Sequence, residues 1–172
     1  MKLILVGYMG SGKSSVGKKL SDVLKYNFVD FDTYIEKNVG MKVNDIFKTK
    51  GEVFFRKQES LYLKEVLKER NTIVALGGGT PCYSNNLNVI KAEKHSKVIY
   101  LKSSIQNLTE RLFIEKSSRP LISHLHTKDD LLEFIGKHLF ERSSYYEQSD
   151  ITIKTDSLSI DQVVESVLLE LY

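Results

Sequence analysis

The sequence of 172 residues has one cysteine, a small net charge and no long apolar run. Because Cys82 has no partner, no disulfide can form within the chain, and a cytoplasmic, reducing location is expected. No apolar run is long enough to span a bilayer, and Met1-Lys2 leads into a short apolar segment without a signal peptide. The net charge is only +3 and no basic run occurs, so neither nucleic acid nor a membrane is expected as a partner.

Arginine is also scarce, since the chain has five arginines among its 25 basic residues. Lysine is therefore the default surface cation, and an arginine marks a place where a planar, bidentate guanidinium is needed. Arg70 ends a predicted helix, where the helix dipole accounts for it. The remaining four are candidates for a functional site: Arg56, Arg111, Arg119 and Arg142.

Short apolar runs alternate with helical patterns along the whole chain. No repeat, linker or low-complexity tract interrupts them, so residues 1–172 are expected to form one domain. The pattern predicts an α/β fold of three layers, in which helices cover both faces of a five-stranded parallel sheet. The expected strands are Lys2–Val6, Asn27–Phe31, Thr72–Leu76, Lys97–Leu101 and Asp150–Lys154. The expected helices cover about 13–25, 52–69, 104–115, 128–148 and 160–171, the second with Phe54, Phe55, Leu61, Val66 and Leu67 inward.

Two segments have a weaker pattern. Residues 32–50 are expected to form short helices broken at Gly40, and the segment of about 32–60 is a candidate substrate-binding region. Residues 116–127 are polar, contain Pro120 and lie between two predicted helices. They are a candidate mobile lid.

The most informative motif is Gly7-Tyr8-Met9-Gly10-Ser11-Gly12-Lys13-Ser14, a complete G-x-x-x-x-G-K-[ST] phosphate-binding loop. An apolar strand precedes it and a helix follows it, which is the context that the motif requires. The backbone N–H groups and the helix N-terminus converge on an anion there. Lys13 can then reach the β- and γ-phosphates and Ser14 can bind Mg²⁺. A nucleoside triphosphate ligand is therefore predicted, held by Gly10, Ser11, Gly12, Lys13, Ser14 and Ser15.

Ligands of parallel sheets bind beyond the carboxyl ends of the strands. Asp30 and Asp32 end the second strand and would share a face in extended geometry, so one could hold Mg²⁺ through water while the other accepts a proton. Asp is also a good helix N-cap, which is the alternative interpretation. Gly77-Gly78-Gly79 follows the third strand, and three glycines exceed the needs of a turn. They predict a backbone wall against a substrate.

Taken in order, these motifs resemble the shikimate kinase family over essentially the whole chain. The resemblance rests on Gly7–Ser15, Val29–Asp32, Gly51-Glu52 with Phe55-Arg56 and Glu59, Leu76–Gly79, Arg119-Pro120-Leu121, and Glu141-Arg142 with Tyr146. It implies a small P-loop kinase that uses ATP and Mg²⁺ to phosphorylate the 3-hydroxyl of shikimate in aromatic amino-acid biosynthesis.

The resemblance also implies roles for individual residues. Lys13, Asp32 and Arg119 would be catalytic, with Asp32 as base or as the group that orients the attacking hydroxyl. Ser14 and Asp30 would hold Mg²⁺, and Arg111 and Arg119 would contact the nucleotide. Shikimate would be bound by Asp32, Arg56, Gly77, Gly78, Gly79 and Arg142. The enzyme is expected to act as a monomer.

Two alternatives remain open from the residues. Another small P-loop kinase could act on gluconate or a nucleoside, although a substrate without a carboxylate would not need two converging guanidinium groups. A regulatory nucleotide-binding module would need neither a base nor a closing lid. The loop Thr155–Leu158 lacks the polar residue that many family members place near adenine, which leaves the choice of base open.

Overall fold

The computed structural model describes residues 1–172 and contains one parallel sheet with the strand order β2-β3-β1-β4-β5. The strands are β1 (Lys2–Val6), β2 (Asn27–Asp30), β3 (Thr72–Ala75), β4 (Ser96–Lys102) and β5 (Ile151–Lys154). Every ladder is parallel: Ile4, for example, pairs with Val74 of β3 and Val98 of β4. The predicted α/β fold with a five-stranded parallel sheet is confirmed.

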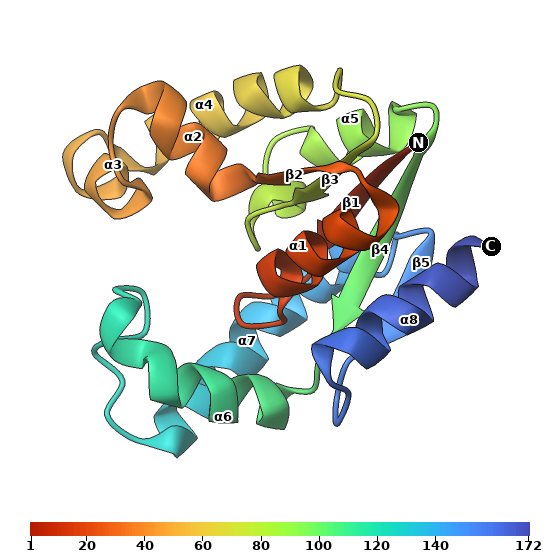
Figure 1. Ribbon diagram of the computed structural model, residues 1–172. Helices are drawn as coiled ribbons and strands as arrows, with labels where there is room; N and C mark the ends of the chain where they lie inside the picture. Colours follow the sequence, from red (N-terminus) through yellow and green to blue (C-terminus); the bar gives the residue numbers. More distant parts are fainter.

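Eight α-helices connect and cover these strands (Figure 1). They are α1 (Lys13–Leu24), α2 (Phe31–Val39), α3 (Val43–Thr49), α4 (Gly51–Val66), α5 (Asn86–Ala92), α6 (Ile105–Glu115), α7 (Lys128–Tyr146) and α8 (Ile160–Leu171). None of the eight has the length and apolar character that crossing a bilayer would require.

Alternation along the strands divides the core into two layers. Leu3 and Leu5 of β1 pack with α1 and α8, whereas Ile4 and Val6 face the opposite way and pack with α2 to α7. Successive strand residues point to opposite faces, so each nearly continuous apolar strand supplies both layers. The three-layer arrangement follows directly from this alternation.

The structure corrects several sequence-based predictions. Strand β2 ends at Asp30, so Asp32 lies in the first turn of α2 and not on the strand. Leu61 is half exposed, and the inward residue of that turn is Leu63. Helix α5 was not predicted, because its short sequence begins with residues of low helix propensity; burial of Ile90 in the core supports it.

The carboxyl ends of the strands meet the segments that carry the motifs. Figure 1 shows the α2–α3 pair and the segment after α6 projecting on the same side of the molecule, the side toward which β1 runs. As predicted, α2 and α3 are separated at Gly40, which adopts a left-handed conformation as the C-cap of α2. The start of β1 lies at the opposite end of the sheet, where the strands begin, close to the N-terminus.

Candidate active site

The phosphate-binding loop joins β1 to α1 in the conformation that its glycines predict. Gly10 and Gly12 have φ values of 77° and 91°, in the left-handed region where side chains are disfavoured, and Gly12 is the N-cap residue of α1. No side chain caps this helix. Its first N–H groups therefore remain available to an anion.

Lys13 is buried at the base of this loop. Its ammonium group donates hydrogen bonds of 2.8 Å to the backbone carbonyls of Gly7 and Tyr8. Burial lowers the pKa of Lys13 to about 8, and the carboxylate of Asp32 opposes that shift. The hydroxyl of Ser11 is also buried and has no hydrogen-bond partner. A bound anion would supply one, because buried polar groups are normally paired.

Asp30 connects the loop to the second strand. Its Oδ2 accepts a hydrogen bond of 2.6 Å from the hydroxyl of Ser14, and its Oδ1 accepts one from the backbone N–H of Thr33. Asp30 is thus the N-cap of α2 as well as a neighbour of Ser14. One oxygen of Asp30 therefore caps helix α2, while the other lies next to Ser14, where a metal ion is expected.

Asp32 lies in the first turn of α2 and reaches the same cavity as Asp30, although it is not on the strand. Burial raises the pKa of Asp32 to about 6, and the negative charges of Asp30 and Glu59 add to the shift. Lys13 acts in the opposite direction. A carboxylate with a pKa near the working pH is suited to accept a proton.

Arg56, on α4, is held by a buried carboxylate. Its Nη1 donates to Oε2 of Glu59 at 2.9 Å, and its guanidinium lies 3.7 Å from the ring centroid of Tyr83. Glu59 is only 1% exposed, and its other oxygen accepts from the hydroxyl of Thr80 at 2.7 Å. Arg56 is thereby oriented by Glu59 on its own helix, α4, and by Tyr83 in the segment after β3.

The glycines after β3 separate the arginines from the phosphate-binding loop. A Cβ atom on Gly79 would lie 3.0 Å from Nη2 of Arg56, and one on Gly78 would lie 3.5 Å from Nη1 of Arg142. The two guanidinium groups therefore contact adjacent residues of the glycine wall. The hydroxyl of Tyr146 donates to the carbonyl of Gly78 at 2.6 Å, which ties α7 to the wall.

The segment 116–127 begins beside the phosphate-binding loop. Arg119 forms an ion pair of 2.6 Å with Glu115, and both residues line the cavity at the loop. The segment is anchored by Ile122, which is fully buried. Arg111, on α6, donates to the carbonyl of Gly10 at 3.3 Å. Both predicted nucleotide-contacting arginines thus lie next to the loop.

The cavity at the loop has a volume of about 260 Å³ and brings together most of the predicted phosphate and metal residues. Asp30, Asp32, Gly77 and Gly78 also line it, whereas Arg56, Arg111 and Arg142 do not. The two substrate arginines lie behind the glycine wall, one on each of two helices. The structure therefore presents a phosphate region and an adjoining guanidinium region that share the wall.

Comparison with known proteins agrees with this geometry. The model of the family described as shikimate kinase matches residues 9–172. The chain belongs to the shikimate kinase family. A shikimate kinase from Flavobacterium johnsoniae is 41% identical over 97% of this chain and 96% of its own length. The family resemblance inferred from the motifs, and the enzyme class of kinase, are confirmed.

Solved structures of the family have the same fold. A shikimate kinase from Bacteroides thetaiotaomicron aligns with a TM-score of 0.92 at 31% identity, covering 99% of this chain and 98% of that one. A shikimate kinase from Acinetobacter baumannii in complex with shikimate aligns with a TM-score of 0.87 at 29% identity, covering 99% and 92%. The P-loop kinase fold is shown at this level of similarity.

Four contacts in the site were not predicted from the sequence. Glu59 was part of the family motif but had no assigned role, although its spacing of three residues from Arg56 on a helix was a usable signal. Tyr83 and Thr80 contact Arg56 and Glu59 across elements, and no local pattern marks such pairs. The hydrogen bond of 2.9 Å between the Tyr8 hydroxyl and Nδ1 of His138 likewise links residues 130 positions apart.

Proposed function

We propose that this chain transfers the γ-phosphate of ATP to the 3-hydroxyl of shikimate, giving ADP and shikimate 3-phosphate. The observation that supports this most directly is that Arg142 and Arg56 lie against Gly78 and Gly79 of the glycine wall, while Asp32 lies against Gly77. Two guanidinium groups suit a planar carboxylate, because each can bind it through two parallel hydrogen bonds. A carboxylate-bearing polyol therefore fits this region of the site.

Asp32 is assigned to the acceptor hydroxyl. Desolvation raises its pKa to about 6, which leaves it ionised at neutral pH while keeping it able to take up a proton. In phosphoryl transfer the transition state is loose, so orientation of the hydroxyl by Asp32 contributes even where little proton transfer has occurred. The proton of the 3-hydroxyl passes to the Asp32 carboxylate as the new O–P bond forms.

Lys13 and Arg119 are assigned to the transferred phosphoryl group. Lys13 already lies against the loop carbonyls, and a phosphate in the loop would replace these carbonyls as its partners. Arg119 would exchange Glu115 for the γ-phosphate, an exchange made easier because that ion pair is partly exposed. Arg111 would flank the nucleotide from α6. Positive charge delivered at the transferring oxygens lowers the barrier.

Mg²⁺ is the expected metal, and the oxygen chemistry of the loop fits it. Mg²⁺ prefers oxygen ligands, retains several waters and is usually bound through one or two carboxylates together with substrate phosphates. The adjacent oxygens of Ser14 and Asp30 meet that description. When bound, the ion would neutralise charge on the phosphate oxygens.

The decisive experiment measures ADP release from ATP and Mg²⁺ with shikimate, with gluconate and with a nucleoside mixture. Release that depends on shikimate supports the proposal, whereas turnover with a control alone would overturn the assigned substrate. Gluconate is the necessary control because it also carries a carboxylate and hydroxyl groups. Identification of the product by ³¹P NMR would test the 3-hydroxyl.

The substitution Arg56→Lys tests the guanidinium region separately. Lysine retains the charge but cannot bind a carboxylate through two parallel hydrogen bonds. Loss of a charge-assisted hydrogen bond predicts a KM for shikimate that is higher by about 10- to 100-fold, with the KM for ATP unchanged. An unchanged KM for shikimate would favour a substrate without a carboxylate.

The proposal places the enzyme in aromatic amino-acid biosynthesis, acting as a monomer in the cytoplasm. The single cysteine supports a reducing compartment. Sedimentation of the purified chain at micromolar concentration would test the monomer. Growth of a strain that lacks its own shikimate kinase, restored by this chain without added aromatic amino acids, would test the pathway.

A further inference from the structure

A second, larger cavity lies at the amino ends of the strands, at the opposite end of the sheet from the phosphate-binding loop. It has a volume of about 940 Å³ and is formed at the starts of β1 and β4, just before β3, and at the ends of α4 and α5. Strand β1 separates it from the loop by five residues, a distance of about 16 Å. The proposed reaction uses none of the residues that line it.

The lining of this cavity is strongly cationic. Six lysine and arginine side chains line it against two glutamates, a net charge of +4, which exceeds the +3 of the whole chain. The rest of the chain therefore carries a net charge of −1. The positive charge of this protein is concentrated around one concave surface and is not spread evenly.

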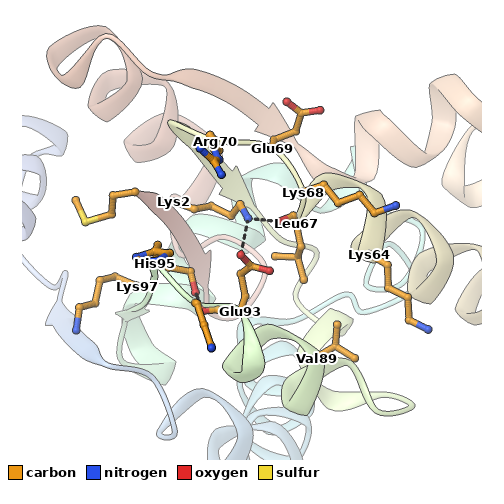
Figure 2. Close-up of a pocket in the computed structure, with 13 residues that line it drawn as sticks. Lys2, Lys64, Leu67, Lys68, Glu69, Arg70, Val89, Glu93, His95 and Lys97 are labelled. Carbon is orange, nitrogen blue, oxygen red and sulfur yellow. Dashed lines mark hydrogen bonds and ion pairs between the residues drawn. The ribbon is translucent and has the colours of Figure 1, made fainter.

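Only one of the six cations has a partner in the protein. Lys2 is 4% exposed, and its ammonium group contacts Glu93 at 3.5 Å and donates to the carbonyl of Leu67 at the end of α4. Figure 2 shows Lys2 near the centre of the cavity lining, joined to these two residues by dashed lines. Neutralisation of a helix C-terminus thus explains Lys2.

The other five cations are not explained in this way. They are exposed and form neither an ion pair nor a side-chain hydrogen bond within the protein: Lys64, Lys68, Arg70, Lys94 and Lys97. Figure 2 places Arg70 and Lys97 on different sides of Lys2, with Lys64 and Lys68 beyond Leu67. Each of these exposed, unpaired side chains is therefore available to contact an anion bound in the cavity.

We propose that this cavity binds a small molecule that carries two or more adjacent phosphate groups. Its volume lies within the range of about 300–1,000 Å³ typical of small-molecule sites. Ammonium and guanidinium groups around a cavity favour phosphate oxygens, which accept several charge-assisted hydrogen bonds at once. Only three lining residues are hydrophobic.

The test uses inorganic tripolyphosphate as the probe and protein whose phosphate-binding loop is already saturated with ADP. Backbone ¹H–¹⁵N NMR spectra recorded during the titration report where the probe binds. Saturable shifts at residues 64–70 and 93–97, with no change at residues 9–15, are expected. Citrate, which carries carboxylates in place of phosphates, should bind more weakly. Equal binding of citrate would overturn the preference for phosphate.

Two pairs of substitutions separate a built site from general attraction to positive charge. Arg70→Gln with Lys97→Gln removes two cations of the cavity, and Lys18→Gln with Lys154→Gln removes two exposed, unpaired lysines elsewhere. Loss of two charge-assisted contacts predicts that tripolyphosphate binds the first variant at least about tenfold more weakly, whereas the control stays within about twofold. Both variants should retain phosphorylation of shikimate, which verifies that they are folded.

Three results would overturn the proposal. These are the absence of saturation at millimolar probe, equal weakening in the two variants, and shifts confined to the phosphate-binding loop. A failure here leaves the kinase assignment intact, because the two sites share no residue. The salt dependence should also be steep for the wild-type chain and shallower after Arg70→Gln with Lys97→Gln.

Discussion

The glycine wall permits a sharp test, because the same substitution two residues apart should damage different steps. A Cβ atom on Gly77 would lie 2.7 Å from Oδ1 of Asp32, whereas one on Gly79 would lie 3.0 and 3.2 Å from the two terminal nitrogens of Arg56. Neither glycine has a positive φ, so alanine is not strained by the backbone. The cost of each substitution therefore comes from the neighbours that the new methyl group meets, which also include the Thr80 hydroxyl at 3.0 Å for Gly77 and the Tyr83 ring at 3.2 Å for Gly79.

The magnitudes follow from these distances. Ordinary contacts begin at 3.4 Å, so Gly77→Ala must displace the Asp32 carboxylate by roughly 0.7 Å. A displacement of that order at a reacting group costs about 100-fold in turnover. Gly79→Ala needs a smaller shift, but Glu59 and Tyr83 hold the Arg56 guanidinium in place. Weakening one charge-assisted contact to the substrate predicts a KM for shikimate that is about 10-fold higher, with kcat nearly unchanged.

Steady-state kinetics with shikimate and ATP varied in turn would separate these effects. Gly136→Ala is the matched control, because its Cβ would lie 3.9 Å from Ile105, an ordinary contact, within helix α7. That variant should keep both kinetic constants and gain up to about 1 kcal/mol in the free energy of unfolding. The reasoning is refuted if Gly77→Ala leaves kcat intact, or if both wall variants change the same constant equally.

The contacts of the site support three more predictions. Asp32→Asn should lower kcat by about 10²- to 10⁴-fold with little change in ATP affinity, measured by calorimetry. Because burial raises the pKa of Asp32 from 3.8 to about 6, the proton it binds stabilises the fold below pH 4, and that contribution is lost as pH rises through 6. Asp32→Asn should therefore raise the free energy of unfolding at pH 7.5 and not at pH 4, by about 1 kcal/mol or less because the Asp32 residue is exposed to solvent, as urea titrations would reveal. Glu59→Ala removes the buried partner of Arg56, whose guanidinium keeps only the longer contact of 3.4 Å to Glu52, and should cost about 2 kcal/mol of stability while raising the KM for shikimate. An unchanged KM would show that the arginine is held by its other contacts. Tyr8→Phe removes the hydrogen bond to His138 and should lower the free energy of unfolding by about 1 kcal/mol, measured by thermal melts. Tyr145→Phe is the control, because Tyr145 is an exposed residue whose hydroxyl has no partner, and it should leave the melting temperature unchanged.

The architecture was accessible from the sequence because its signals are local. Short apolar runs alternate with helical periodicity, and this alternation alone predicts a parallel sheet covered on both faces. Helix α5 escaped notice because a helix of seven residues that starts in asparagine-rich sequence has a weak local signal. Its stability comes from burial of Ile90, which no local pattern records.

The Asp30–Asp32 pair illustrates how a correct expectation can rest on a wrong local geometry. Extended geometry was expected to align the two carboxylates, but the strand ends at Asp30 and the helix begins one residue later. Both carboxylates still line one cavity, because the turn from strand to helix occurs at the carboxyl edge of the sheet. The position was determined by topology and not by the period of the strand.

The sequence by itself determined the phosphate-binding loop, the order of the elements and the shortlist of arginines, because each depends on residue type at fixed short spacing. Only the tertiary structure decided that Arg56 and Arg142 contact neighbouring glycines and that Tyr83 stacks on Arg56. The cationic cavity at the far edge of the sheet is also a tertiary feature, since its lining comes from residues 1 to 97 of the chain. Such contacts join positions tens of residues apart, and packing of the helices on the sheet brings them together.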